Sequence, residues 1–289
     1  MPVKETSFHD PHAYIPYAYL TDKQRVLVDV NDEGMRGSAA ELGWALDKLS
    51  ADNDPYVRSN VAKNQRCPAV ILCLLATDIN NMPRSYAAEN PNMPGEMLQQ
   101  LARDSDFVIR CSVAKNSSTP ANALTELARN HMGSERAWVA GNPNTPIDLL
   151  LWLAEDPGSD VQSSVAENPN TPAETLAKLA NNPYARYGVA SNPNTPSEVL
   201  QRLATDFDSL VRSNVAENPS TSDETLRLLA TDSHHGVRSG VAKNPSSSVD
   251  ILCYLAADSD IRMSHLPMMN PHKLNEKPFL VQAPMAMVR

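Results

Sequence analysis

The sequence is poor in cysteine, with four in 289 residues, and none of them lies in a Cys-x-x-Cys pair. This number is too small for a disulfide framework in a chain of this length, so we expect reduced thiols. Two of the four share one place in the repeat described below, seven repeats apart, and this separation excludes a common four-ligand metal site. The cysteines are Cys67, Cys73, Cys111 and Cys253.

Glycine is also scarce, with 10 residues, and the motifs that announce common enzyme chemistry are absent. There is no G-x-S-x-G, H-E-x-x-H, phosphate loop or glycine-rich dinucleotide fingerprint. The histidine pairs have no second ligand type at helical spacing, so we expect solvated side chains and no metal. These pairs are His9 with His12, His234 with His235, and His265 with His272. The sequence therefore predicts no catalytic residue, no cofactor and no enzyme.

Positive charge is in deficit: 25 Lys and Arg stand against 34 Asp and Glu, a net charge of -9. This balance disfavours non-specific binding to nucleic acid or to anionic membranes. No apolar run approaches the roughly 18 residues that a membrane span requires. The opening MPVKETSFHDPHAY lacks the layout of a secretory signal. We therefore expect a cytoplasmic protein that does not enter a membrane.

What the sequence does contain is a repeat of 26 residues, once contracted to 24, marked by an asparagine that is usually followed by proline. Periods of this length are typical of solenoid proteins. We call these residues the anchor asparagines. They are Asn64, Asn90, Asn116, Asn142, Asn168, Asn192, Asn218 and Asn244.

Two leucine positions follow each anchor asparagine, eight and eleven residues later, as in Leu176 and Leu179 after Asn168. This spacing places them on one face of a helix. Within the unit 165–180, Thr171, Pro172 and Glu174 predict the start of this helix through a capping box with a first-turn proline.

A shorter first helix precedes each anchor asparagine. Asp54-Pro55 and Asn182-Pro183 have the pattern of a cap followed by a first-turn proline. Because the residue before a proline is pushed out of the helical region, an Asn-Pro step at the anchor ends this helix. A single pair of helices cannot bury its own apolar face, so neighbouring pairs must stack.

The pattern divides the chain into three parts. Residues 38–258 form the solenoid, with full repeats over 51–258 and one leading helix over 38–50. Residues 1–37 are an N-terminal extension that caps the first unit. Residues 259–289 hold a decayed repeat at Asn270-Pro271 and a methionine-rich tail. The two ends are where we expect any self-association of the chain.

The consensus D-x-x-x-x-V-R-x-x-V-A-x-N-P-x-T-P-x-E-x-L-x-x-L-A resembles the leucine-rich repeat variant family and is similar to HEAT-like repeats. The resemblance covers about 200 residues. It implies an all-α, right-handed superhelical solenoid of about eight helix pairs, in which an α-helix alternates with a short 3₁₀-like helix. It also implies an iron–sulfur cluster on cysteines ahead of the repeats, but residues 1–66 contain no cysteine. The cluster is therefore not expected, and the longer period leaves ordinary pairs of α-helices possible.

An arginine stands six residues before each anchor asparagine, with Gln162 as the one exception. We call this set the arginine row. Its guanidinium groups either bind carboxylates or phosphates of a partner, or pair with the aspartate of the preceding loop and join the units. We favour the second interpretation because arginine and aspartate repeat together. The row is Arg58, Arg84, Arg110, Arg136, Arg186, Arg212 and Arg238.

The position two residues after the arginine row varies, and a solenoid can vary its recognition surface while its core stays constant. Tyr86 and Trp138 occupy this position, and Trp152, Tyr184 and Tyr187 lie elsewhere in the repeats. Aromatic residues are enriched at interface hot spots, whereas the simpler interpretation is that some fill gaps between helices.

The sequence therefore predicts a non-catalytic scaffold that binds a protein or peptide through variable first-helix positions. The alternative is a nucleic-acid-binding, HEAT-like protein that uses the arginine row.

Overall fold

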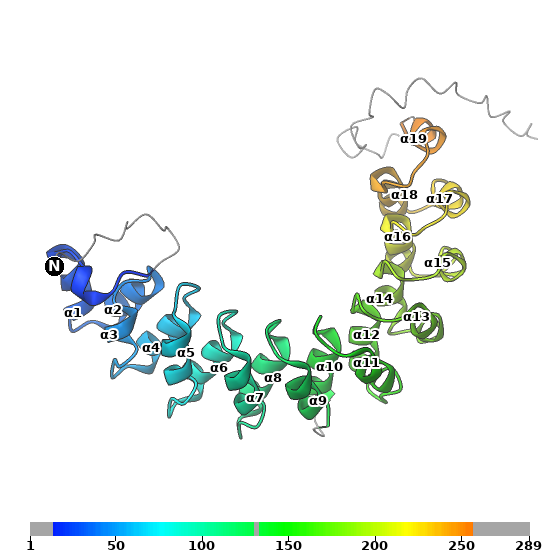
Figure 1. The fold of residues 1–289 in the computed structure, drawn as a ribbon. Coiled ribbons are helices and arrows are strands. Elements are labelled where there is room, and N and C mark those ends of the chain that lie inside the picture. Colours follow the sequence, from blue (N-terminus) through cyan, green and yellow to red (C-terminus); the bar gives the residue numbers. More distant parts are fainter. Residues whose placement is uncertain (1–13, 130–132, 257–289) are drawn as a thin grey trace, which may run out of the picture. The chain divides into compact units, whose positions relative to one another are not determined.

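The computed structural model describes residues 14–129 and 133–256 (Figure 1). Within these ranges the chain forms 19 α-helices and one short 3₁₀ helix, and the only strand-like contact is a single bridge between Ile15 and Trp44. The chain divides into an N-terminal unit, Met1–Leu149, and a C-terminal unit, Leu150–Arg289. The predicted decayed repeat and tail at 259–289 lie outside the described residues, as do the pairs His9/His12 and His265/His272.

Helix pairs follow one another through both units. The N-terminal unit contains η1 (Tyr17–Tyr19), α1 (Asp22–Asp29), α2 (Glu33–Glu41), α3 (Leu46–Leu49), α4 (Pro55–Lys63), α5 (Ala69–Leu75), α6 (Asn81–Glu89), α7 (Gly95–Leu101), α8 (Phe107–Lys115), α9 (Ala121–Ala128) and α10 (Gly133–Gly141). Helix α11 (Ile147–Leu153) crosses the boundary. The C-terminal unit continues with α12 (Ser159–Glu167), α13 (Ala173–Leu179), α14 (Arg186–Ser191), α15 (Ser197–Leu203), α16 (Ser209–Glu217), α17 (Asp223–Leu229), α18 (His235–Lys243) and α19 (Val249–Leu255). None of the helices in the described ranges has the length and apolar character that a membrane span requires.

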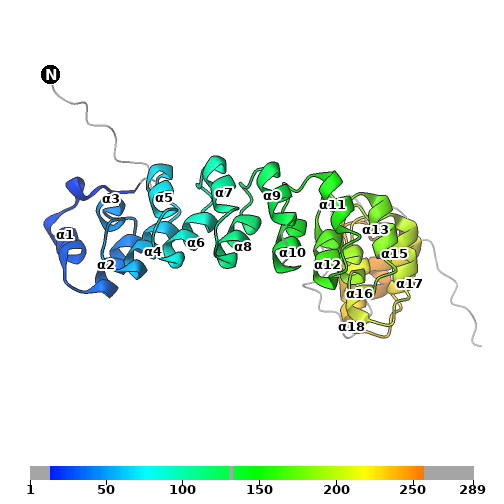
Figure 2. The ribbon, with the colours of Figure 1, turned by 90° about the horizontal axis from the view of Figure 1, so that it is seen from below.

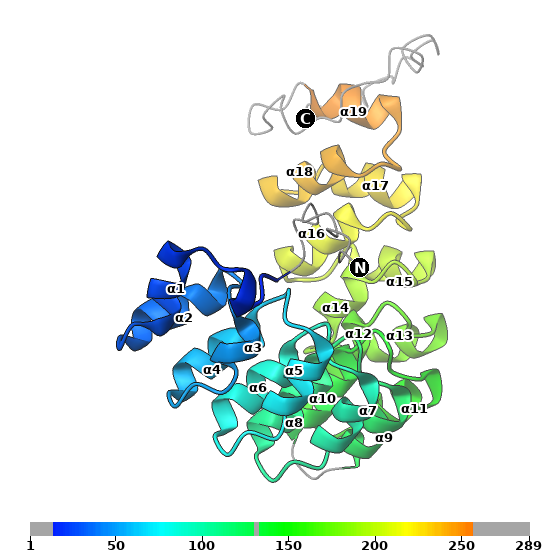
Figure 3. The same cartoon turned by 60° about the vertical axis from the view of Figure 1, so that its left-hand side comes forward.

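First and second helices form separate rows within each unit. In the N-terminal unit, α4, α6, α8 and α10 lie along one side and α5, α7 and α9 along the other (Figure 2). In the C-terminal unit, α14, α16 and α18 are stacked beside α13, α15 and α17 (Figure 3). This repeated packing of helix pairs confirms the predicted all-helical solenoid class. The second helices are α-helices, seven residues long in α5 and α13, and not 3₁₀ helices.

The contraction between Asn168 and Asn192 shortens a first helix. Helix α14 has six residues, whereas α12 and α16 have nine. The backbone N–H of Tyr184 donates to Asn182 Oδ1 over 2.9 Å, but the helix itself starts only at Arg186. The predicted first-turn proline after Asn182 is therefore wrong here. It is confirmed at α4, where Asp54 caps the helix and Pro55 is its first residue.

The core of both units lies between the two rows of helices. Every leucine at the two repeated positions is buried, from Leu72 and Leu75 to Leu252 and Leu255. Burying one such side chain contributes roughly 1.5–3 kcal/mol, and each leucine is covered by residues of its own pair and of neighbouring pairs.

The predicted threonine caps are wrong. Thr171 is fully buried, and its hydroxyl donates to the carbonyl of Val165 over 2.5 Å, while Pro172 occupies the cap position of α13 with no side-chain cap bond. The carbonyl of Val165 lies in the last turn of α12, where it accepts the N–H of the C-cap residue Asn168 over 3.2 Å, and the threonine hydroxyl is a second donor to it. Glu174 instead forms an exposed ion pair with Lys178 over 3.3 Å. The same bond recurs at Thr119, Thr145, Thr195, Thr221 and Ser247.

The single leading helix predicted over 38–50 is also wrong, because two helices, α2 and α3, occupy this region. Gly43 and Ala45 between them have positive φ angles of 78° and 50°. An α-helix cannot continue through such residues. In the N-terminal extension, residues Val26 to Asp29 lie in helix α1, and α1 packs against α2.

Candidate partner-binding surface

The anchor asparagines join successive helix pairs through buried hydrogen bonds. Asn90 Nδ2 donates to the carbonyls of Ala62 over 2.7 Å and Asn64 over 2.9 Å, and its Oδ1 accepts from the N–H of Asn92. Its side chain bridges the ends of two consecutive first helices and is only 3% exposed. The same two bonds are donated by Asn116, Asn142, Asn192, Asn218 and Asn244, whereas Asn64 donates to the carbonyls of Ala40 and Glu41 at the end of α2. Asn168 is likewise buried and accepts from the N–H of Asn170.

The arginine row joins successive pairs at the opposite ends of the first helices. Arg58 donates through Nε and Nη2 to the carboxylate of Asp78, over 2.5 Å and 2.8 Å, and through Nη1 to the carbonyl of Asp52. The predicted partner was the aspartate of the preceding loop. That prediction is wrong: the carboxylate comes from the following loop, and the preceding loop contributes backbone carbonyls.

These ion pairs perturb the groups that form them. Burial alone would raise the pKa of Asp78, but hydrogen bonds from Arg58 and from the N–H of Asn80 outweigh it and lower that pKa below its ordinary value. The hydrogen bond to Asp78 raises the pKa of Arg58. Arg58 and Asp78 side chains are 12% and 8% exposed, so little of either faces solvent. Matching ion pairs are Arg84–Asp104, Arg186–Asp206 and Arg212–Asp232.

Two ion pairs of this network depart from the spacing of the repeat, and the sequence did not predict them. Arg36 pairs with Asp52 over 2.6 Å, although it stands 22 residues before Arg58 and not 26. Arg110 pairs over 2.7 Å with Glu135, which is completely buried in the first turn of α10. The aspartate column is broken at Asn130. The asparagine at this position could have indicated that Arg110 pairs with an acid from another position of the repeat.

One rung of the network carries no charge. Gln162 replaces the arginine and donates to the carbonyl of Asp156 over 2.8 Å, and Asn182 replaces the aspartate and donates to Gln162 Oε1. The two substitutions occur together, so the geometry of the rung is kept without an ion pair. Arg136 and Arg238 occupy the same place in α10 and α18, and Arg238 donates to the carbonyl of Asp232 over 2.8 Å.

The predicted aromatic residues lie at several places. Tyr86 on α6 and Trp138 on α10 share one position of the repeat, with α8 between them. The ammonium of Lys63 lies 3.9 Å from the Tyr86 ring centroid, and that of Lys115 lies 4.0 Å from the Trp138 ring. Trp138 is 45% exposed, so its ring is open to solvent although lysine covers one face.

The other three aromatic residues belong to the C-terminal unit. Trp152 lies on a second helix, α11, whereas Tyr187 lies in α14 and Tyr184 just before it, so Trp152 is not part of the same row. All three are exposed, as are Phe207 and Leu210 at the start of α16. The guanidinium of Arg186 lies 4.8 Å from the Phe207 ring.

A row of exposed apolar residues at the N-terminal ends of α4, α6 and α8 was missed. Tyr56, Met82 and Val108 each stand eight residues before an anchor asparagine, and they are 47%, 44% and 45% exposed. Ile79 and Phe107 flank them and are 92% and 50% exposed. We call these five residues the apolar edge. The sequence feature that could have revealed it is a variable repeat position that is apolar in three consecutive repeats.

A hollow of about 340 Å³ is lined by residues of α6 and by Val108 of α8, beside the apolar edge. Met82, Tyr86 and Val108 provide its apolar walls, and the rest of the lining is polar. Ser112 within this region donates to Glu89 Oε1 over 3.0 Å. The hollow is therefore lined both by Tyr86, which the sequence predicted as a binding residue, and by Met82 and Val108 of the apolar edge.

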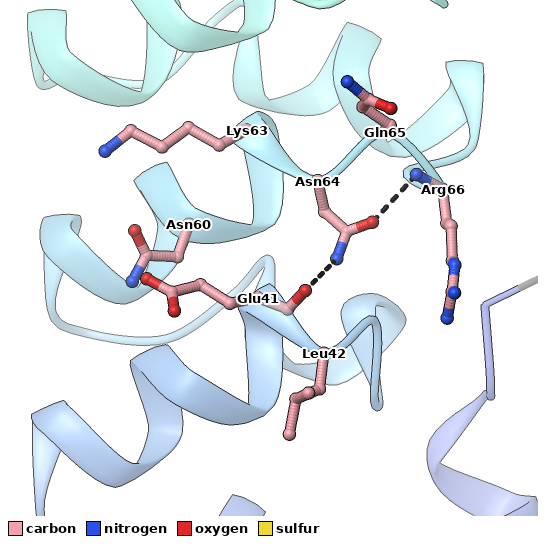
Figure 4. Close-up of a pocket in the computed structure, with 7 residues that line it drawn as sticks. All are labelled: Glu41, Leu42, Asn60, Lys63, Asn64, Gln65 and Arg66. Carbon is pink, nitrogen blue, oxygen red and sulfur yellow. Dashed lines mark hydrogen bonds between the residues drawn. The ribbon is translucent and has the colours of Figure 1, made fainter.

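A larger hollow of about 570 Å³ lies where α2 and α4 end (Figure 4). Asn64 crosses it, accepting from the N–H of Arg66 and donating to the carbonyl of Glu41. The side chains of Lys63 and Arg66 extend to opposite sides of Asn64. Its charged groups therefore do not converge on one point where a ligand would bind.

The cysteines and the described histidines do not converge either. Burial raises the pKa of Cys67 to about 12, which keeps it a thiol. Burial also raises the pKa of Cys111, and the charge of Glu135 adds to the effect. The rings of His234 and His235 are stacked 5.1 Å apart.

Comparisons with known proteins point to the repeats. The family model for a leucine-rich repeat variant domain matches residues 111–168 and 160–213, and the leucine-rich repeat variant model matches 210–234. No curated protein matches the chain. Among solved structures, one described as a leucine-rich repeat variant with a novel repetitive motif is 25% identical. That alignment covers 74% of this chain and 87% of the other, with a TM-score of 0.49. An engineered protein is 19% identical over 76% of this chain and 94% of its own, with a TM-score of 0.20.

Proposed function

The chain belongs to the leucine-rich repeat variant family, and we propose that this repeat scaffold binds a protein or peptide on its row of first helices, without catalysis. The observation that carries the proposal is that exposed Trp138 and half-buried Tyr86 share one repeat position, each with a lysine of the preceding first helix over its ring.

The polar residues that repeat most strictly are used by the fold. The amides of the anchor asparagines hold backbone carbonyls, and Arg58, Arg84 and Arg110 each hold a carboxylate and a loop carbonyl. A guanidinium so engaged has few donors left for a phosphate or carboxylate of a partner. We therefore assign partner binding to variable exposed positions and not to the arginine row.

Aromatic rings are suited to this role because they bury a large area and lose little conformational entropy on binding. A partner that covered Trp138 would also remove water from the contact with Lys115, and desolvation strengthens such a contact. Tyr86 would contribute in the same way through Lys63. Truncating each ring is expected to cost more than 1 kcal/mol of binding free energy if the ring is a hot spot.

The test is retention of a partner by the immobilised full chain, identified by mass spectrometry and then purified. We expect the double variant Tyr86→Ala, Trp138→Ala to lose the purified partner, with the circular dichroism spectrum unchanged. The matched control is Leu74→Ala on α5, which is 57% exposed on the row of second helices. Equal retention by the wild type and by the double variant would contradict the proposal.

A further inference from the structure

The apolar edge of the N-terminal unit has a spacing, a charge and a hollow that together select one kind of ligand. We infer that it binds a basic, proline-rich peptide in the polyproline II conformation, with an apolar side chain at every third residue. This inference rests on the proposed function and names the chemistry of the partner.

The spacing comes from the stacking of the helices. Tyr56, Met82 and Val108 occupy the same repeat position on α4, α6 and α8, and α4 packs on α6 as α6 packs on α8. Packed helices lie about 8–10 Å apart. The edge therefore offers one apolar contact about every 8–10 Å along the row of first helices.

Among extended peptides, the polyproline II helix matches this spacing. It has three residues per turn and rises about 3.1 Å per residue, so one face recurs about every 9.3 Å. A β-strand presents the same face every second residue, about every 6.6–6.8 Å, and would fall out of step after one contact. A bound polyproline II segment can therefore place one side chain on each successive helix pair.

The aromatic residues of this surface also favour a proline-rich ligand. Tyr56 and Phe107 lie on the edge itself, and Tyr86 lines the adjoining hollow together with Met82 and Val108. Aromatic-lined grooves are the usual receptors for polyproline II segments, whose preformed conformation reduces the entropy lost on binding. The volume of about 340 Å³ accommodates an apolar side chain of the peptide.

The charge beside the edge is negative. Asp54 and Asp106 cap α4 and α8, and each accepts a backbone N–H with one oxygen, from Tyr56 and Val108. Neither forms an ion pair with a described residue, because the nearby arginines are paired with other acids. The side-chain hydrogen bond from Asn81, with the backbone bond from Val108, lowers the pKa of Asp106 and keeps it ionised.

Glu89, the last residue of α6, lines the hollow, and Lys63, the last residue of α4, places its ammonium 3.9 Å from the ring of Tyr86, which lines the same hollow. At the N-terminal ends of the helices, beside the apolar edge itself, the carboxylates are those of Asp54 and Asp106. Lysine or arginine side chains between the apolar residues of the ligand would therefore meet carboxylates.

The probe is a dye-labelled peptide of four leucine-proline-lysine triplets, titrated with the full chain and followed by fluorescence anisotropy. The control peptide has the same composition, ordered so that no two leucines are three residues apart. We expect the triplet peptide to bind at least about tenfold more tightly than the control. Only in the triplet peptide do the leucines recur every third residue, so only they can contact successive helices of the apolar edge.

Three variants locate the site. Met82→Ala is expected to weaken binding by about tenfold, while Leu74→Ala on the second-helix row leaves it unchanged. Asp106→Asn keeps a good helix cap but removes a charge, so we expect weaker binding and a shallower dependence on salt. Circular dichroism checks that each variant is folded.

Equal binding of the two peptides, or equal effects of Met82→Ala and Leu74→Ala, would overturn the inference. Absence of binding at low salt would overturn it too. If the triplet peptide fails while a purified partner still requires Tyr86 and Trp138, the partner class is wrong and the proposed function stands.

Discussion

Replacing one anchor asparagine by aspartate tests how the helix pairs are joined. Asn116 Nδ2 donates to the carbonyls of Ala88 over 2.7 Å and Asn90 over 2.9 Å, and its Oδ1 accepts from the N–H of Ser118 over 2.8 Å. The side chain is 6% exposed. Asn116→Asp keeps the shape and the accepting oxygen, but it turns a second oxygen toward two carbonyls.

The alanine variant sets the scale of the effect. Asn116→Ala loses three hydrogen bonds and removes one donor from each of the carbonyls of Ala88 and Asn90, which costs about 2–4 kcal/mol at roughly 0.5–1.5 kcal/mol for each bond. In a domain of this size, each kcal/mol lowers the melting temperature by about 2–4 °C, so we expect a loss of about 4–16 °C. At neutral pH Asn116→Asp should be less stable still, because an ionised carboxylate then lies buried against carbonyl oxygens.

The aspartate variant also acquires a pH dependence of known sign. Burial against carbonyls raises the folded-state pKa of the new carboxyl above its unfolded value of about 3.9. The folded state then binds the proton more tightly, so the penalty is small below about pH 4 and grows as pH rises through the folded-state pKa. Only the protonated carboxyl can donate a hydrogen bond to one of the carbonyls.

Thermal melts followed by circular dichroism from pH 4 to pH 7 measure both effects. The control is Asn122→Asp, the same change at an exposed position of α9, which should shift stability by no more than about 0.5 kcal/mol. If Asn116→Asp were as stable as the wild type at pH 7, donation by Nδ2 would not be what joins the helix pairs.

Three further predictions follow from the contacts described above. Asp78→Asn should destabilise the fold by about 1–3 kcal/mol at neutral pH by leaving Arg58 without its carboxylate. Because the folded-state pKa of Asp78 is lowered, its contribution is present above the unfolded value of about 3.9 and is lost as pH falls through the folded value, so melts of the two proteins should converge in acid. Leu124→Ala, which opens a cavity at a fully buried side chain, should cost about 2–5 kcal/mol in denaturant titrations, and a cost below 1 kcal/mol would contradict the packing described for the core. A thiol reagent followed by mass spectrometry should modify exposed Cys253 well before buried Cys67, whose pKa is about 12, and the reverse order would refute the burial of Cys67.

The repeat could be read from the sequence because its strictest positions have one role in every unit. A leucine such as Leu176 is buried wherever it recurs, so its period reports the packing of the helices directly. The arginine row was equally visible, but its partner was not. Asp52 of the preceding loop is nearer to Arg58 in the sequence, but the side chain of Arg58 reaches Asp78 of the following loop.

Other features depend on tertiary contacts or on single residues. Thr171 has the pattern of a local cap, yet its buried hydroxyl donates to the carbonyl of Val165 at the end of the preceding helix. Ala45 has no sequence feature that reveals its positive φ, so the break between α2 and α3 was missed. The apolar edge could have been predicted by comparing the position of Met82 across repeats, as was done for Tyr86.

The shortened helix α14 shows which part of the repeat can change length. Asn192 still donates to the carbonyls of Ala166 and Asn168, each over 2.8 Å, as the anchors of full-length repeats do. The repeat is shortened at the start of its first helix, which begins only at Arg186. The hydrogen bond from Asn182 to Gln162 Oε1 still connects this region to the preceding first helix. Insertions and deletions should therefore be tolerated at this end of a repeat and rejected at the anchor. For protein engineering, this end is where new sequence can be introduced without disturbing the neighbouring repeats.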